Sequence, residues 1–363
     1  MSSLNLKTTN GALSGTLRYG FVGLGVMGHG MVRNIHAKMP ATAKLVVCEI
    51  NQARLEQFLQ ESHSSYPEKT VEVANTPIEV CNRADIIITM LPKSIHVVET
   101  FTDGTSGFLS SASPDSTTKH PSTTAESVTP RPPLDKLFLD CSSIDVATST
   151  KIGNLVASYS KGSWKFVDAP VSGGPAGSEA GNLTFMVGLE QAENPELLKN
   201  TIYPTLSMMG PVNHIYLCGQ AGAGLATKQL NNYLAYVGYL GLCEVMNTGT
   251  RYGLDPATLS AVLNASSGMN WNSLHHNPVK GVNPTASSAN DFKTGFTVEL
   301  AGGVIDDAVT LMEQVGAVTV LAKPTKDVFT KARNSAKCKG MEARSVWRLF
   351  SENEGKDLVN NTY

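Results

Sequence analysis

Several features that define large classes of proteins are missing from this chain of 363 residues. No apolar run approaches the roughly 18 residues of a membrane-spanning helix. No Cys-x-x-Cys pair is present, which argues against a zinc site and a disulfide framework and fits a reducing, intracellular compartment. The six cysteines are scattered along the chain, at Cys48, Cys81, Cys141, Cys218, Cys243 and Cys338. We therefore expect no bound metal.

An excess of charge of either sign is also missing. The net charge is −2, so nucleic acid and membranes are not expected partners, whereas small molecules are. No acidic residue precedes Glu49. The Ser- and Thr-rich segment 1–17 is either a mitochondrial targeting segment or a disordered tail, and its composition leaves both interpretations open.

A dinucleotide-binding fingerprint lies near the start of the chain. A predicted strand, Arg18 to Val22, runs into three glycines and then into a helical pattern. The first glycine allows a tight turn, the second lets a pyrophosphate touch the backbone, and the third lets helix and strand pack closely. We expect all six residues of this turn to bind the cofactor: Gly23, Leu24, Gly25, Val26, Met27 and Gly28.

Glu49 ends the next predicted strand, Lys44 to Cys48. A carboxylate at this strand end accepts both ribose hydroxyls of the cofactor and repels a 2′-phosphate, which favours NAD over NADP. The other interpretation of Glu49 is an exposed charge at the end of a strand.

Two more predicted strands, Ala84 to Leu91 and Leu137 to Asp140, alternate with helical patterns. This alternation predicts a doubly wound parallel sheet, whose ligands bind at the carboxyl ends of the strands. Leu91 and Pro92 fall at that edge. Ser143 follows the second strand, where it either reaches the nicotinamide ribose or caps the next helix. Residues 110–135, rich in Ser, Thr and Pro, predict a flexible insertion.

A glycine-rich segment separates predicted strands at Phe166-Val167 and at Leu183 to Val187. Gly173 and Gly174 can adopt backbone conformations closed to other residues, and free N–H groups beside the Ser172 hydroxyl suit a carboxylate. The simpler interpretation is a turn between two strands.

The second half of the chain is helical in character. A long pattern from Leu225 to about Tyr252 carries Lys228 and Asn232, which share one face of the helix because they are four residues apart. Polar residues in an otherwise core-forming helix favour a functional site, although a solvent-facing first turn is the alternative. Asp255-Pro256 predicts the start of another helix.

In this order, the segments resemble the β-hydroxyacid dehydrogenase family, and specifically its 3-hydroxyisobutyrate branch. The resemblance covers about residues 18–350. It rests on Gly20 to Gly28, Ile88 to Pro92, Asp140 to Asp145, Asp168 to Gly188 and Gly224 to Asn232; Asn264 to Gly268, Trp271 and Asn277-Pro278 point to the branch. We expect a Rossmann domain over 18–219, an all-helical substrate or dimerisation domain over 220–352, and a tail at 353–363.

The resemblance implies that Lys228 is the catalytic lysine and that Asn232 orients the substrate. It implies that Ser172, Gly173 and Gly174 hold the substrate carboxylate. Further implied cofactor contacts are Glu49, Leu91, Pro92, His96 and Ser143, with His96 standing in place of the usual Asn and Ser143 in place of the usual Thr.

The implied reaction is the NAD-dependent oxidation of 3-hydroxyisobutyrate to methylmalonate semialdehyde, a step of valine breakdown in branched-chain amino acid catabolism. The hydride passes from C3 to NAD while Lys228 takes the proton of the hydroxyl group. The family resemblance places this activity in the mitochondrial matrix, with the cytosol as the alternative, and leaves a homo-oligomer open.

Two positions depart from the family pattern. A Lys-Asp pair on a helix of the second domain aligns with Gly303-Val304, and Met269 stands where the branch tends to have Arg. Two other functions therefore stay open: a dehydrogenase or reductase of another short β-hydroxy acid or semialdehyde, and a cofactor-binding protein without turnover.

Overall fold

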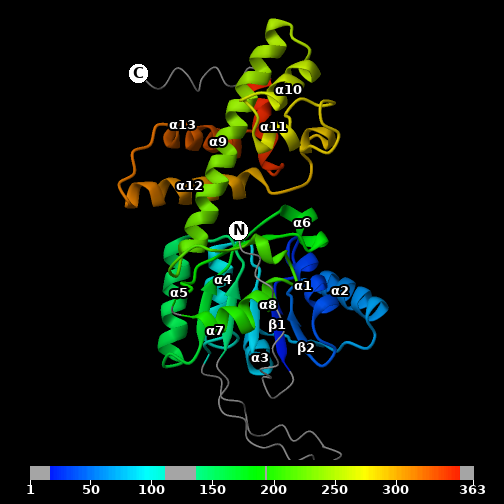
Figure 1. Cartoon of the computed structure of the whole chain (residues 1–363), viewed down its shortest axis with the longest axis vertical. Helices are drawn as coiled ribbons and strands as arrows, with labels where there is room; N and C mark the ends of the chain where they lie inside the picture. Colours follow the sequence, from blue (N-terminus) through cyan, green and yellow to red (C-terminus); the bar gives the residue numbers. More distant parts are fainter. Residues whose placement is uncertain (1–16, 111–135, 193, 352–363) are drawn as a thin grey trace, which may run out of the picture.

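The computed structural model describes residues 17–110, 136–192 and 194–351 (Figure 1). The tail or targeting segment predicted at 1–17, the insertion predicted at 110–135 and the tail predicted at 353–363 lie almost entirely outside these ranges. Among the described residues, no helix is both long and apolar enough to cross a membrane.

A six-stranded parallel sheet forms the first part of the fold. Its strands are β1 (Arg18–Val22), β2 (Lys44–Cys48), β3 (Val71–Val73), β4 (Ile86–Thr89), β5 (Leu137–Asp140) and β6 (Lys165–Asp168). They lie in the order β3-β2-β1-β4-β5-β6, the arrangement of a doubly wound dinucleotide-binding fold. The predicted doubly wound sheet is confirmed.

Helices cover both faces of this sheet and bury its strands on both sides. Phe21 packs in one apolar cluster, with α1 (Gly28–Lys38) and α2 (Gln52–Ser65). Val22, its neighbour in β1, packs in a second cluster on the other face. That cluster contains residues of α3 (Pro77–Arg83), α4 (Ser94–Thr102) and α5 (Val146–Tyr159).

A smaller sheet follows, in the order β7 (Val171–Ser172), β8 (Thr184–Val187), β9 (Ile215–Leu217). The predicted glycine-rich loop contains a short helix, α6 (Gly174–Ala180). A 3₁₀ turn over Val212–His214 directly precedes β9.

The helical segment between β8 and β9 is irregular. It consists of α7 (Pro195–Leu197), a π turn (Leu198–Ile202) and α8 (Tyr203–Leu206). Pro204 has no backbone N–H and its ring clashes with the carbonyl four residues earlier, so a regular helix is not available there. The interruption takes the form of the π turn.

The second part is all-helical, as predicted. It consists of α9 (Ala223–Tyr252), α10 (Pro256–Ala265), α11 (Trp271–His275), α12 (Val298–Gln314), α13 (Ala322–Asn334) and α14 (Trp347–Ser351), with 3₁₀ turns at Ser287–Asn290 and Ala343–Val346. Asp255 caps α10 by accepting from the Thr258 N–H. Pro324 lies in the first turn of α13, where its missing N–H costs no hydrogen bond.

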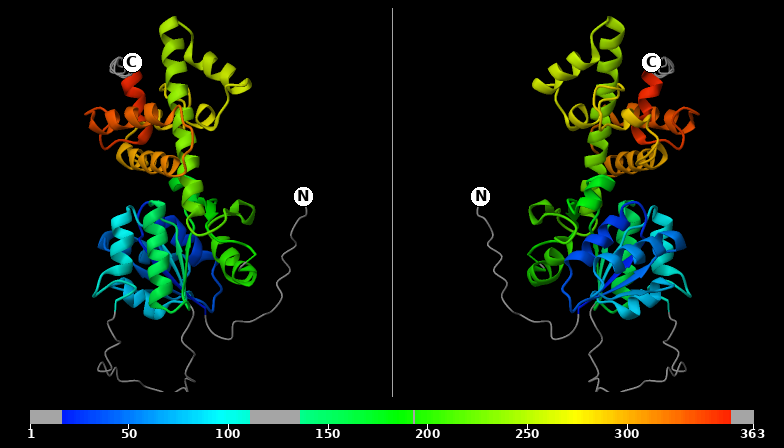
Figure 2. Two further views of the ribbon diagram at one scale, coloured as in Figure 1. Left: turned by 90° about the vertical axis from the view of Figure 1, so that its left-hand side faces the viewer. Right: turned by 90° about the vertical axis from the view of Figure 1, so that its right-hand side faces the viewer.

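The 30-residue helix α9 connects the two parts. It starts beside the sheets and runs through the helical part, which lies beyond one end of the strands (Figures 1 and 2). Its later turns pack in the apolar cluster of the helical part, where Tyr239 and Cys243 are fully buried beside Ile305 and Phe329. Its first turns, which carry Lys228, remain at the sheets.

Candidate active site

The glycines of the fingerprint have the geometry that a dinucleotide turn needs. Gly23 has a φ of 95°, and a side chain there would come within 2.5 Å of the Met90 carbonyl oxygen. A Cβ at Gly28 would lie 1.9 Å from the Gly23 carbonyl oxygen, so α1 can start this close to β1 only with glycine. The tight turn and the close packing predicted from the sequence are confirmed.

Glu49 is brought directly to this turn. One carboxylate oxygen accepts from the Leu24 N–H at 2.5 Å and the other from the Asn51 N–H at 2.8 Å. Glu49 is therefore not a freely exposed charge. Sequence reasoning missed Arg54, whose Nη1 would lie 3.3 Å from a Cβ at Gly25. Its guanidinium stands beside the turn that is predicted to hold the pyrophosphate.

The loops after β4 and β5 are joined side by side. The Leu91 N–H donates to Ser142 Oγ at 2.9 Å, and Ser94 Oγ donates to Asp145 Oδ2 at 2.9 Å. Asp145 also caps α5 through the Thr148 N–H, so the alternative in which Ser143 caps that helix is wrong. The structure thus brings Leu91 and Ser143 to the same edge of the sheet.

Pro92 is exposed in the first of these loops, and His96 lies in the first turn of α4. Among the described residues, the buried Nδ1 of His96 has no hydrogen-bond partner. Its cofactor contact stays a prediction.

A buried carboxyl group underlies the same edge. Asp140 accepts from Thr89 Oγ1 at 2.8 Å and from the Ser142 N–H at 3.1 Å. Burial raises its pKa to about 6, although these hydrogen bonds favour the charged form. Asp140 thereby connects β4 to the loop that carries Ser142 and Ser143.

Asp168, which was given no role from the sequence, fixes the start of α9. Its carboxylate accepts from the Gly222 N–H at 2.8 Å and from the Leu225 N–H at 3.0 Å. A Cβ at Gly224 would lie 2.2 Å from the Met186 carbonyl oxygen, so the helix starts in close contact with β8. The signal in the sequence was a charged residue at the end of a buried strand.

Lys228 lies one turn beyond this anchored helix start and is 9% exposed. Burial lowers the pKa of its amine to about 8, and no carboxylate among the described residues forms an ion pair with it. Its neighbour Gln229 donates to the Ile144 carbonyl oxygen at 3.3 Å, which holds this turn of α9 against the loop of Ser143. The alternative of a solvent-facing first turn is therefore wrong.

Asn232 lies one turn further along the same face of α9, half-buried, and its side-chain oxygen accepts from Asn231 Nδ2 at 3.3 Å. A buried amine of lowered pKa beside an amide is suited to hold and release a proton next to a polar ligand.

Ser172, Gly173 and Gly174, here called the 172–174 turn, connect β7 to α6. Gly173 and Gly174 have φ values of 138° and 64°, a region that favours glycine. Their N–H groups make no hydrogen bond within the described residues. Among the described residues, no hydrogen bond or ion pair joins this turn to Lys228, although Asp168 lies at the end of the strand that leads to β7 and also binds the start of α9.

The helix that departs from the family pattern faces the first part of the chain. α12 is continuous through Gly303, and a Cβ at Gly303 would meet nothing within 4 Å. Asp307 lies one turn further along the same face. Burial, with smaller contributions from the carboxylates of Asp145 and Asp306, raises the pKa of Asp307 to about 6. On the side of α12 that faces the loop after β5, there is therefore open space at Gly303 and an acidic side chain at Asp307. At the other position that departs from the family pattern, the Met269 side chain is 51% exposed.

Known proteins match this chain over both of its parts. The family model described as the NAD binding domain of 6-phosphogluconate dehydrogenase matches residues 18–211. The model described as NAD-binding of NADP-dependent 3-hydroxyisobutyrate dehydrogenase matches residues 222–348.

Individual relatives agree with these models. A probable mitochondrial 3-hydroxyisobutyrate dehydrogenase of Arabidopsis thaliana is 35% identical over 86% of this chain and 81% of its own length. The human mitochondrial 3-hydroxyisobutyrate dehydrogenase is 34% identical over 80% and 75%. A solved structure of the Mycobacterium tuberculosis 3-hydroxyisobutyrate dehydrogenase with L-serine has a TM-score of 0.71 at 26% identity, over 92% of this chain and 98% of that one.

The doubly wound sheet, its glycine turn and the buried lysine define an NAD-binding oxidoreductase of the β-hydroxyacid dehydrogenase type. Within that class, the chain belongs to the 3-hydroxyisobutyrate dehydrogenase family.

Proposed function

We propose that this protein oxidises 3-hydroxyisobutyrate to methylmalonate semialdehyde with NAD, in valine breakdown. The observation that carries the proposal is Lys228, a buried amine with a pKa lowered to about 8, at a helix start fixed by Asp168. Relatives at 30–35% identity that are named for this activity support the substrate.

The residues of the first part fit a dinucleotide. The turn at Gly23 to Gly28 leaves room for a pyrophosphate to approach the backbone, with the Arg54 guanidinium alongside it. The Glu49 carboxylate suits the two hydroxyls of the adenosine ribose and disfavours a 2′-phosphate, so NAD is the preferred cofactor although one matched family model is named for NADP.

In the proposed mechanism, the substrate carboxylate binds the free N–H groups and the Ser172 hydroxyl of the 172–174 turn. Asn232 orients the substrate, and its C3 hydroxyl lies beside Lys228 Nζ. Lys228 in its neutral form accepts the hydroxyl proton, and in the reverse direction its ammonium form returns the proton to the aldehyde oxygen. The bound nicotinamide supplies the hydride chemistry. Leu91, Pro92, His96 and Ser143 line its side of the site.

A second candidate is oxidation of another short β-hydroxy acid, or reduction of the corresponding semialdehyde. The open space at Gly303, the acid at Asp307 and the uncharged Met269 favour it, because each changes the charge or the volume that the family pattern presents.

A substrate and cofactor panel tests both candidates. Initial rates are measured with NAD and with NADP on 3-hydroxyisobutyrate and on hydroxy acids that differ in chain length and in the C2 substituent. The proposal expects the highest kcat/KM for 3-hydroxyisobutyrate with NAD. Preference for another acid would support the second candidate instead.

We further propose that the protein resides in the mitochondrial matrix, as the names of its eukaryotic relatives suggest, and that it forms a homo-oligomer. Exposed apolar side chains along the outer face of α9, including Leu234 at 70% and Tyr252 at 84% exposure, support self-association. Fractionation of cells and sedimentation of the purified chain test these two points. The separate apolar clusters support a domain division near residue 219.

A further inference from the structure

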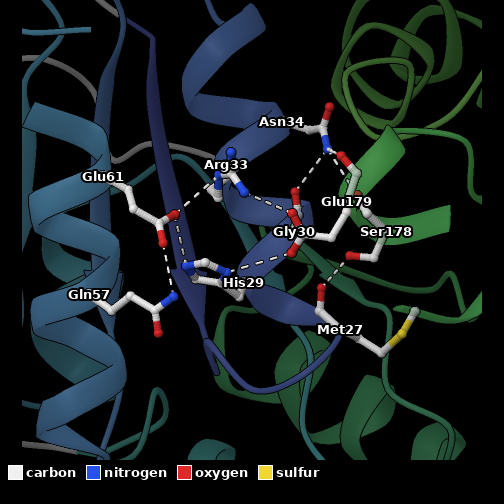
Figure 3. Close-up of polar contacts among 9 residues, drawn as sticks. All are labelled: Met27, His29, Gly30, Arg33, Asn34, Gln57, Glu61, Ser178 and Glu179. Carbon is white, nitrogen blue, oxygen red and sulfur yellow. Dashed lines mark hydrogen bonds and ion pairs between the residues drawn. The ribbon is translucent and has the colours of Figure 1, made fainter. Parts of the chain in front are cut away.

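Three charged side chains and a histidine lie where α1, α2 and α6 meet (Figure 3). His29 and Arg33 stand one turn apart on α1, facing Glu61 of α2 and Glu179 of α6. Arg33 approaches Glu179 to 2.8 Å and Glu61 to 3.3 Å. The His29 ring nitrogens lie 3.4 Å from Glu61 and 3.6 Å from Glu179. Both carboxylates are thus shared between the same two side chains of α1.

Contacts with the backbone accompany these side-chain contacts. Ser178 Oγ donates to the Met27 carbonyl oxygen at 2.5 Å. Asn34 Nδ2 donates to the carbonyl oxygens of Ser178 at 2.9 Å and Glu179 at 3.2 Å. A Cβ at Gly30 would lie 2.7 Å from the Glu179 nitrogen, so the two helices touch through their main chains.

Apolar packing does not hold α6 in place. Its sequence, Gly-Pro-Ala-Gly-Ser-Glu-Ala, buries only one residue, Ser178. The helix lies between glycines with positive φ, Gly174 at its start and Gly181 after its end. The position of α6 therefore depends on its polar contacts with α1, which also carries the end of the dinucleotide fingerprint.

We propose that His29, Arg33 and Glu179 are positioning residues for the hydroxy-acid substrate. By holding α6 on α1, they fix the 172–174 turn relative to the cofactor turn at Gly23 to Gly28. The inference rests on the proposed function, in which the 172–174 turn binds the substrate carboxylate. None of the three side chains touches the reacting atoms.

Replacing Glu179 tests this role, because Glu179 is the only member of this group on α6. Glu179→Gln removes the charge and keeps the size of the side chain. We expect the KM for the hydroxy acid to rise about three- to tenfold, with the KM for NAD within twofold of wild type and the Tm unchanged, since a half-exposed ion-pair network contributes modestly to stability. Glu179→Asp, which keeps the charge, should recover part of the loss.

The matched control is Glu196→Gln, an exposed glutamate of α7 whose carboxylate accepts from Asn200 Nδ2 at 2.8 Å. It should leave both KM values at the wild-type level. Equal rises in both KM values for Glu179→Gln, a rise together with a fall in Tm, or no change at all would each overturn the positioning role.

Hydrogen exchange separates this inference from the proposed function. In Glu179→Gln the amides of residues 172–182 should exchange faster than in wild type, while those of β1 and α9 are unchanged. If the wild-type protein turned over no hydroxy acid, the proposed function would fail. Faster exchange in Glu179→Gln would still show that Glu179 fixes α6 on α1, whereas unchanged exchange would refute that role directly.

Discussion

The protonation of Lys228 provides the most quantitative prediction. Burial lowers its pKa from 10.5 to about 8. At pH 7, about 9% of an amine with a pKa of 8 is neutral, against about 0.03% at a pKa of 10.5, so burial supplies roughly 300 times more of the general base. In the oxidation direction, kcat/KM should rise about tenfold per pH unit below pH 8 and level off above it. The reduction rate should fall above the same pH, because it needs the ammonium form.

The same shift in pKa affects stability with a definite sign. Burial disfavours the charged amine, so a charged Lys228 lowers the stability of the folded protein at pH 7. This loss disappears as the pH rises from about 8, the pKa in the folded protein, to 10.5, the pKa in the unfolded chain. The difference corresponds to about 3 kcal/mol. Lys228→Met should therefore be inactive and yet at least as stable as wild type at pH 7.

The assay measures initial rates of oxidation and of reduction from pH 6 to pH 10. Urea unfolding of wild type and of Lys228→Met measures the stability. An oxidation profile that is flat through pH 8, or one that keeps rising beyond pH 10, would refute the reasoning. So would a Lys228→Met variant that unfolds more easily than wild type, since the loss of activity would then report misfolding.

Three further predictions concern the surroundings of the site. Gly303→Ala should raise the free energy of unfolding by about 1 kcal/mol, measured in urea, whereas Gly302→Ala should not, because its Cβ would lie 2.7 Å from Arg333 Cδ. Asp140 has its pKa raised from 3.8 to about 6, so the wild type should lose about 1 kcal/mol of stability between pH 5 and pH 7. Asp140→Asn should lose this dependence, measured by urea melts at the two pH values. Glu49→Gln should shift the ratio of NADP to NAD affinity by about tenfold or more towards NADP, because a charged acceptor of the ribose hydroxyls is lost. Fluorescence titration measures both affinities, and an unchanged ratio would contradict the role given to Glu49.

Local signals in the sequence predicted much of this fold. The bounds of β1, β2 and β5 agree residue for residue with the predicted strands, because short apolar runs between helical patterns have few other ways to be buried. The cap of α10 at Asp255 was equally predictable, since a capping side chain acts within three residues of its own position.

Elements that depend on distant contacts were not predictable. The sequence predicts a loop where α6 lies, because the helix buries only Ser178 and so leaves no apolar pattern. It packs instead on α1, some 150 residues earlier in the chain. The role of Asp168 required knowing that β6 meets the start of α9, 54 residues later. Ser142 and Ser143 are equivalent in the sequence, and only the structure distinguishes them, through the hydrogen bonds that join Ser142 to Leu91 and to Asp140.

The roles of Lys228 and Ser172 came from the family resemblance more than from local pattern. A lysine in the first turns of a helix is compatible with an exposed position, and its burial appears only in the folded chain. The sequence shows only that Gly303 has no side chain. The open space around this position is seen only in the folded chain.

The most direct test of the account is the production of reduced nicotinamide from NAD and 3-hydroxyisobutyrate by wild type and by Lys228→Ala, with NAD binding measured on both proteins. We expect steady turnover by wild type, a loss of at least about a hundredfold in the variant, and equal NAD affinity. Tight NAD binding without turnover by the wild-type protein, or turnover that survives in the variant, would contradict it.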